Sequence, residues 1–159
     1  MTQQQLKTAM ERHGDTVYRL ALCRTQNTAD AEDVYQDVFL RLYGQRTESW
    51  DQEHIRAWLI RTTVNRCADV GRFRQKRGTL PLEELGDVAG TADETAAELW
   101  AAVGSLPEKL RTVVHLHYAE GYATEEIAAM LRIPAVTVRT RLHRGRLQLK
   151  ELLGGDDYA

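Results

Sequence analysis

The chain has 159 residues and a mass of 18.1 kDa, enough for one ordinary domain or two small ones. Hydrophobic residues make up 43% of it and charged residues 28%, a composition that excludes collagen, disulfide miniproteins and a mostly disordered chain. No apolar run approaches the ~18 residues of a membrane span, and the first residues lack the apolar stretch of a secretory signal. We therefore expect a globular, cytoplasmic protein without membrane insertion.

Charge is unevenly distributed, although the net charge is only −2. Residues 135–150 contain five cations and no acid, whereas residues 79–98 contain six acids and no lysine or arginine. The small net charge argues against a protein that coats nucleic acid by charge alone. The separated blocks instead suggest partners of opposite sign for different parts of the chain.

Apolar residues recur at helical spacing through most of the chain, and no alternating run of β-branched residues predicts a strand. A first amphipathic segment begins at Val17, and a polar break at 25–28 separates it from a second helix over 31–42. Gly44 is placed to end the second helix, and a third is expected over 53–74. These segments are expected to share one core.

The helical pattern lapses over residues 78–95, which hold three glycines, a proline and five acids. Such a composition predicts a flexible acidic linker between two domains. We assign residues 1–77 to the first domain, 78–94 to the linker and 95–159 to the second domain. The predicted fold class is all-α, with two small helical domains.

Residues 124–146 have the pattern of a helix-turn-helix. The expected inner face and turn consist of Ile127, Ala128, Leu131, Ile133, Pro134, Val138 and Leu142. Arg132 stands where many such turns carry glycine, so a left-handed backbone there would cost ~1–2 kcal/mol. The arginines of the second helix are left facing outward, where they can meet phosphates and base edges in a major groove.

Two patterns in the first domain indicate binding surfaces. Asp33, Gln36 and Asp37 lie three and four residues apart, so they form an acidic stripe that either pairs with a basic partner helix or is simply solvated. The helix that follows combines Trp58 with many arginines, and aromatic rings among cations are typical of single-stranded DNA binding. We interpret Trp58 itself as a core residue.

In order along the chain, the segments DAEDVYQDVF, HIRAWLIRTTVNRCADVGRFRQKR and LPEKLRTVVHLHYAEGYATEEIAAML are followed by TVRTRLHRGR. This succession resembles the extracytoplasmic-function group of the sigma-70 family, and the resemblance covers almost the whole chain. It implies an alternative sigma factor that directs promoter recognition and transcription initiation. The implied partners are core RNA polymerase, through its β′ clamp helices and β flap, promoter DNA and an anti-sigma factor.

The resemblance also implies roles for particular residues. The first domain would bind polymerase and open the −10 element, and the second would read the −35 element. The implied polymerase-binding residues are Asp33, Gln36, Asp37 and, as an apolar anchor, Phe39. The implied −10 residues are Trp50, Arg61, Asn65, Arg66, Arg72 and Arg74. The implied −35 residues are Arg139, Thr140, Arg141, His143 and Arg144.

Two other classes of function are alternatives to a sigma factor. A helix-turn-helix regulator that does not join the polymerase would have no need of the DAEDVYQDVF motif or of the arginine-rich helix. An enzyme is not indicated, because His115 and His117 are two apart on an expected helix and point to different faces. We expect no catalytic residues, metal site or cofactor, and we interpret Cys23 and Cys67 as small buried hydrophobes.

Overall fold

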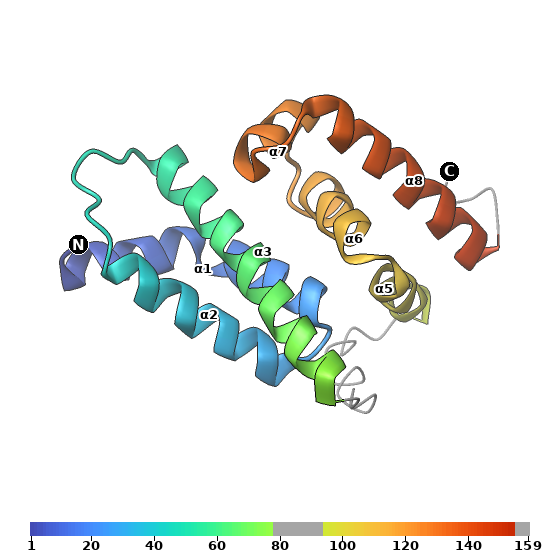
Figure 1. Cartoon of the computed structure of the whole chain (residues 1–159), viewed down its shortest axis with the longest axis horizontal. Coiled ribbons are helices and arrows are strands. Elements are labelled where there is room, and N and C mark those ends of the chain that lie inside the picture. Colours follow the sequence, from blue (N-terminus) through green and yellow to red (C-terminus); the bar gives the residue numbers. More distant parts are fainter. Residues whose placement is uncertain (78–93, 155–159) are drawn as a thin grey trace. The chain divides into compact units, whose positions relative to one another are not determined.

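The computed structural model describes residues 1–77 and 94–154, without the side chains of 74–77 and 94. The described residues form seven α-helices and one π-helical turn, with no strand among them, which confirms the predicted all-α class (Figure 1). The chain divides into two compact units, Met1–Leu80 and Pro81–Ala159. The expected linker lies outside the described residues except for Glu94.

The first unit is a bundle of three helices in which each helix packs against the other two. They are α1 (Gln3–Thr25), α2 (Thr28–Tyr43) and α3 (Gln52–Arg77). α1 begins much earlier than the apolar periodicity predicts, because Thr2 and Gln5 form a capping box. In that box the Thr2 hydroxyl accepts a hydrogen bond from the Gln5 N–H, and the Gln5 side chain accepts one from the Thr2 N–H.

The break between α1 and α2 falls inside the predicted polar segment. Gln26 takes a left-handed conformation, with φ of 54°, and its N–H donates to the carbonyl of Leu22. The buried side chain of Asn27 then accepts from the Asp30 N–H at 2.8 Å and caps α2. Gly44 ends α2 as predicted, although its φ of −80° does not require glycine.

The second unit is built around one long helix, α8 (Ala135–Leu153), which packs against three others. These are α5 (Glu94–Ser105), α6 (Glu108–Val114) and α7 (Thr124–Leu131), and the π-helical turn η2 (His115–Ala119) continues α6. α8 lies close to α6 at Gly145, where an added Cβ would stand 2.7 Å from Cγ2 of Val114. A helix pair that approaches this closely needs a residue without a side chain at the contact.

α7 and α8 form the predicted helix-turn-helix. Ile127, Val138 and Leu142 are buried as expected, and Met130 joins them. Arg132 adopts the left-handed conformation expected from its position, with φ of 58°, and its N–H donates to the carbonyl of Ala128. The turn therefore has the geometry that glycine usually supplies.

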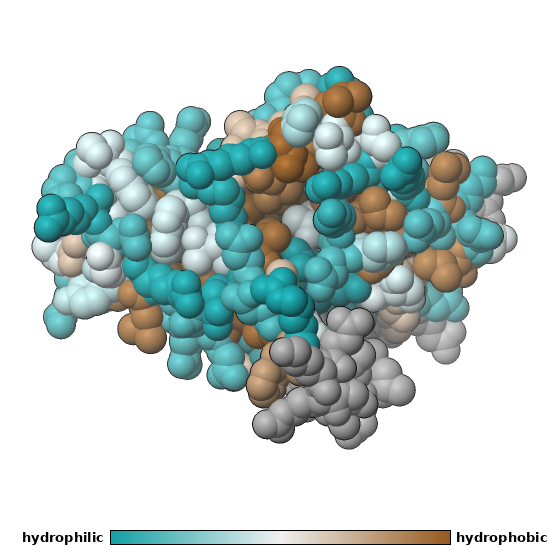
Figure 2. Space-filling model, in the orientation of Figure 1, coloured by the Kyte–Doolittle hydropathy of each residue, from teal (hydrophilic) through white to brown (hydrophobic). Residues whose placement is uncertain are grey.

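The face in Figure 2 is largely hydrophilic, with separate apolar patches. Among the described residues, the large apolar side chains that stay exposed include Leu40, Tyr43 and Phe73 in the first unit. No described helix is long and apolar enough to cross a membrane. Exposed apolar side chains scattered on a monomer are ordinary, so these gain meaning only from their neighbours.

The left-handed turn leads to a stability prediction. Arg132→Gly and Arg132→Ala both remove the guanidinium group and its aliphatic stem. Only glycine also removes Cβ, the atom that makes positive φ costly. We expect the glycine variant to be more stable than the alanine variant by ~1 kcal/mol, measured by urea denaturation followed by circular dichroism. Equal stabilities, or a more stable alanine variant, would contradict a left-handed backbone at this position.

Candidate protein and nucleic-acid interfaces

One face of α2 combines acids with exposed apolar side chains. Asp33, Gln36, Asp37, Leu40 and Tyr43 lie at spacings that place them on this face, called here the α2 face. Asp33 and Gln36 are exposed, and Leu40 is 67% exposed. An apolar side chain surrounded by polar groups is the arrangement found at the centre of many protein interfaces.

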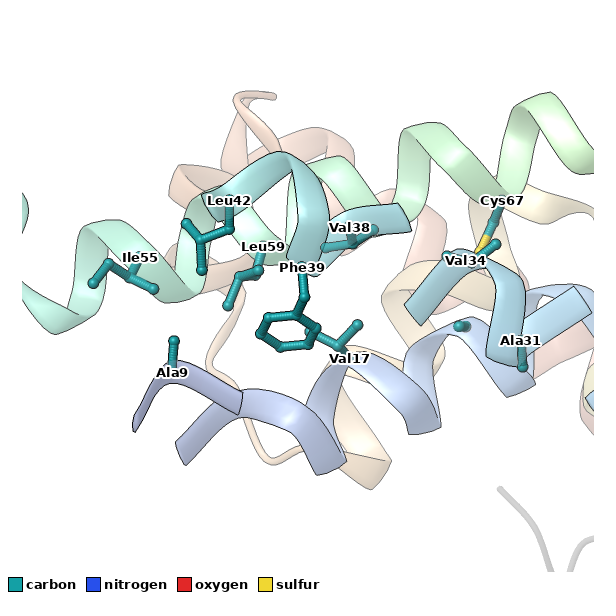
Figure 3. Packing of buried hydrophobic residues seen from close by; sticks show 11 residues of the cluster. Ala9, Val17, Ala31, Val34, Val38, Phe39, Leu42, Ile55, Leu59 and Cys67 are labelled. Atoms are coloured by element: carbon teal, nitrogen blue, oxygen red, sulfur yellow. The ribbon is translucent and has the colours of Figure 1, made fainter. Parts of the chain in front are cut away.

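Phe39 does not belong to this face, which corrects its assignment as the apolar anchor for the polymerase. It is only 2% exposed, and its ring lies 4.9 Å from the ring of Tyr35. Figure 3 shows the ring directed from α2 toward Val17 of α1. Because α2 packs against both α1 and α3, its buried arc is wide enough to include Phe39 as well as Val38.

The loop before α3 carries an aromatic stack. Trp50 lies parallel to His54, with ring centroids 4.2 Å apart, and its centroid is 6.0 Å from that of Trp58. Both tryptophans are partly buried against the core, as expected for Trp58. The adjoining residue Gln52 places its side-chain oxygen 3.0 Å from Nε2 of His13, whose pKa is lowered by burial.

Three of the residues predicted to bind −10 DNA lie on one face of α3. Asn65 is exposed, and it shares one face of the helix with Trp58, Arg61 and Arg72, which lie at helical spacing. Arg61 is half-buried and Arg72 is exposed. The side chain of Arg74 lies outside the described part of the structure.

Arg66 connects α3 to the α2 face. Its Nε lies 2.7 Å from Oδ2 of Asp37, and its Nη1 donates to Oδ2 of Asp69 at 2.8 Å. Asp37 also accepts from Nε of Arg41 at 2.8 Å, and Asp69 also accepts from Arg72. Residues predicted for two different partners are therefore ion-paired to one another, which the sequence pattern did not reveal.

The predicted −35 residues lie on the outer side of α8. Thr140, His143 and Arg144 are exposed, and the side chain of Arg139 is 58% exposed and 3.9 Å from Oε1 of Glu125 on α7. Arg141 is half-buried, and together with Thr140 and Arg144 it borders a groove between α8 and α6. The outward set is thus presented by a helix whose opposite side is buried at Val138 and Leu142.

A groove of about 560 Å³ runs between α8 and the start of α6. Its lining includes Lys109, Arg141 and Arg144 but no acid, together with Leu110 and Val136. The groove thus combines three cations with the apolar side chains of Leu110 and Val136, and Lys109 is a member that the sequence analysis missed. The sequence shows a lysine two residues after Pro107, but only the packing of α6 on α8 places this lysine beside the arginines of α8.

The two histidines have separate partners within the second unit. His115 Nε2 lies 3.0 Å from Oε2 of Glu120, and Nδ1 of His117 lies 2.8 Å from the carbonyl oxygen of Tyr122. Among the described residues, no group of three or more histidines, cysteines or acids could hold a metal ion. Cys23 and Cys67 are both buried free thiols, as predicted.

Comparison with known proteins gives matches to two family models, in the order of the two units. Residues 9–79 match sigma-70 region 2, and residues 96–149 match sigma-70 region 4. The chain is 33% identical over 161 residues to the ECF sigma factor SigW of Bacillus subtilis, covering 87% of this chain and 83% of SigW. The chain belongs to the extracytoplasmic-function sigma factors of the sigma-70 family.

Two further relatives are also ECF RNA polymerase sigma factors. The chain is 35% identical over 146 residues to SigM of Mycobacterium tuberculosis, covering 90% of this chain and 74% of SigM. It is 36% identical over 154 residues to SigE of Mycolicibacterium smegmatis, covering 91% of this chain but only 60% of SigE. These likenesses support an alternative sigma factor over a free-standing helix-turn-helix regulator.

Solved sigma factors share the fold. The structure of CnrH in complex with the cytosolic domain of CnrY gives a TM-score of 0.72 at 28% identity, covering 98% of this chain and 92% of CnrH. The sigma factor RpoE of Bartonella quintana, in complex with the anti-sigma factor NepR, gives 0.70 at 20% identity, covering 96% and 99%. Of these two, CnrH is the more closely related in sequence.

The contrast between Phe39 and its neighbour Leu40 can be measured as stability. Phe39→Ala would leave a cavity in the core of the first unit and should lower the free energy of unfolding by ~3–5 kcal/mol. Leu40→Ala removes an exposed side chain and should change it by less than ~0.5 kcal/mol. Urea denaturation followed by circular dichroism measures both. A stable Phe39→Ala variant would show that this ring is not part of the core.

Proposed function

We propose that this sigma factor uses the α2 face to dock on core RNA polymerase, α3 with the loop before it to open the −10 element, and α8 to read the −35 element. The observation that carries the proposal is the order of the two matches: region 2 and region 4 follow one another in one chain. The exposed side chains described above supply suitable chemistry at each place.

Docking on the β′ clamp helices would rest on Leu40, with Asp33, Gln36 and Asp37 around it. An acidic surface attracts a basic partner helix and sets its register, whereas a buried apolar side chain slows dissociation. Leu40 therefore takes the role first given to Phe39, and Tyr43, which is 41% exposed, extends the apolar contact. We infer a second contact between region 4 and the β flap.

Opening of the −10 element would proceed by capture of unpaired bases and without nucleotide hydrolysis. Pocketing or stacking one base is worth ~1–3 kcal/mol, which is comparable to the cost of unpairing a step or two of an A·T-rich element. The exposed amide of Asn65 can hydrogen-bond a base edge, and the loop residue Trp50 offers an aromatic surface. Arg61, Arg66, Arg72 and Arg74 would hold the strand's phosphates.

Recognition of the −35 element would place α8 in the major groove. Arg139, Thr140, His143 and Arg144 lie on one helical face, and each is exposed. A bidentate arginine–guanine contact gives ~1–3 kcal/mol of discrimination, whereas an arginine on phosphate strengthens binding to every sequence. We assign Arg141 to phosphate because its side chain is half-buried, whereas the other four are exposed.

The same proposal covers the regulation of the protein and its place in the cell. CnrH and RpoE each form a complex with a second protein, and for RpoE that protein is an anti-sigma factor. We infer an anti-sigma partner for this chain and a cytoplasmic location, where it would meet polymerase. We assign it no reaction of its own, because promoter choice and strand opening require only binding energy.

Run-off transcription with purified core polymerase tests the function as a whole. Wild-type protein should direct transcription from members of a random promoter pool, while Leu40→Ala and the double variant Asp33→Lys, Asp37→Lys should lose core binding by tenfold or more. Met10→Ala, which removes an exposed apolar side chain from α1, is the matched control and should bind normally. Wild-type protein that binds duplex DNA but never core polymerase would support a free regulator.

Promoter selection with single arginine variants tests the reading of the −35 element. Arg139→Ala or Arg144→Ala should relax the preference at one −35 position by about 1–3 kcal/mol. Arg146→Ala is the control, because Nη1 of Arg146 donates to the hydroxyl of Tyr118. If Arg139→Ala and Arg144→Ala both lower transcription equally from all sequences, base reading by α8 is wrong and DNA shape must supply the specificity.

A further inference from the structure

The contact between Asp37 and Arg66 joins two surfaces that have different proposed partners. Asp37 lies on the α2 face, whereas Arg66 belongs to the −10 set on α3. Oδ2 of Asp37 is 2.7 Å from Nε of Arg66, and the two side chains are 37% and 28% exposed. Both side chains are thus partly exposed, although the Nε atom of Arg66 that meets Asp37 is itself buried.

This contact is the central link of a longer chain of charges. Arg41, Asp37, Arg66, Asp69 and Arg72 are joined in that order by ion pairs. Three guanidinium groups are balanced by only two carboxylates, so the removal of one negative charge leaves a distinctly more cationic surface.

The Nε and Nη1 atoms of the Arg66 guanidinium group have different partners. Nη1 donates a hydrogen bond to Asp69, which lies three residues along the same helix. Nε is close to Asp37 but makes no hydrogen bond within the described part of the structure. Asp69 thus fixes the direction of the side chain, while Asp37 mainly supplies opposing charge across the gap between α2 and α3.

We propose that Asp37 restrains Arg66 in the free chain, and that a cationic group of the polymerase which binds Asp37 releases Arg66 to a phosphate of the unpaired −10 strand. Asp69 is the positioning residue that keeps Arg66 in place after release. This inference rests on the proposed function, because it takes the α2 face as the docking surface and Arg66 as a DNA contact.

The physical basis is competition for one carboxylate. A partner's cation at Asp37 offsets the charge that neutralises Arg66, so the potential near Arg66 becomes more positive. A nucleic-acid phosphate then gains a contact that the free chain offers only weakly. Because such coupling is reciprocal, bound DNA must strengthen docking on polymerase by the same factor.

The experiment uses the full chain and a fluorescently labelled single-stranded oligonucleotide that carries the −10 sequence found by promoter selection. Asp37→Asn mimics the neutralised carboxylate without any polymerase. We expect it to bind the oligonucleotide about two- to fivefold more tightly than wild type, a gain on the scale of one surface ion pair. The slope of log affinity against log salt should steepen by about 0.7, the value for one added phosphate contact.

Two controls isolate the contact. Glu32→Gln removes one negative charge from an exposed side chain of α2 that is not part of the α2 face, and should leave the affinity and the salt slope as in wild type. In the Arg66→Gln background, Asp37→Asn should give no gain, because the cation that it releases is absent. This second control also excludes an effect through Arg41, which remains present in both backgrounds.

The inference is overturned if Asp37→Asn gives no gain, if Glu32→Gln gives an equal gain, or if the gain persists without Arg66. The proposed function is tested separately by binding of the same oligonucleotide to wild-type holoenzyme. If holoenzyme binds and opens promoters but Asp37→Asn leaves the oligonucleotide affinity unchanged, the coupling is wrong and the proposed function stands. If holoenzyme does not bind the −10 strand, both the coupling and the proposed function are wrong.

Discussion

The rotation of α2 about its own axis is the constraint on which the first unit depends. α2 packs against both α1 and α3, and its buried side chains are Ala31, Val34, Val38, Phe39 and Leu42. A helix is rigid, so burial of this arc also determines which residues point away from it. The acids and Leu40 are outward for this reason, and Asp37 comes within reach of Arg66 on α3 because both helices share one core.

In the second unit, the packing of α8 against three other helices likewise determines which of its sides is exposed. Val138 and Leu142 are buried against the other helices, and Gly145 lets α8 approach α6 closely. The opposite side of α8 is therefore the exposed, basic one. The turn before it is short, and the left-handed Arg132 ends α7 so that the chain changes direction within a few residues.

The two units treat their cations differently. Within the described part of the chain Arg144 has no carboxylate at ion-pair distance, and Arg139 has only the distant Glu125. Arg66 and Arg72 instead lie against Asp37 and Asp69. A cation without a counterion offers its full charge to a phosphate, whereas a paired one must first give up its partner. Arg66 and Arg72 on α3 thus carry counterions among the described residues, whereas Arg144 on α8 does not.

Periodicity and motif order were enough to predict the all-α class, the helix-turn-helix, the buried Val138 and Leu142, and the family, because these depend on local spacing along the chain. They also marked Arg132 as a position where many such turns carry glycine, and the structure gives it a left-handed backbone. They could not place Phe39 in the core, since the width of a buried arc depends on how many helices pack against it. Nor could they show that Asp37 meets Arg66, because the two are far apart in sequence and only the packing of α2 on α3 brings opposite charges together.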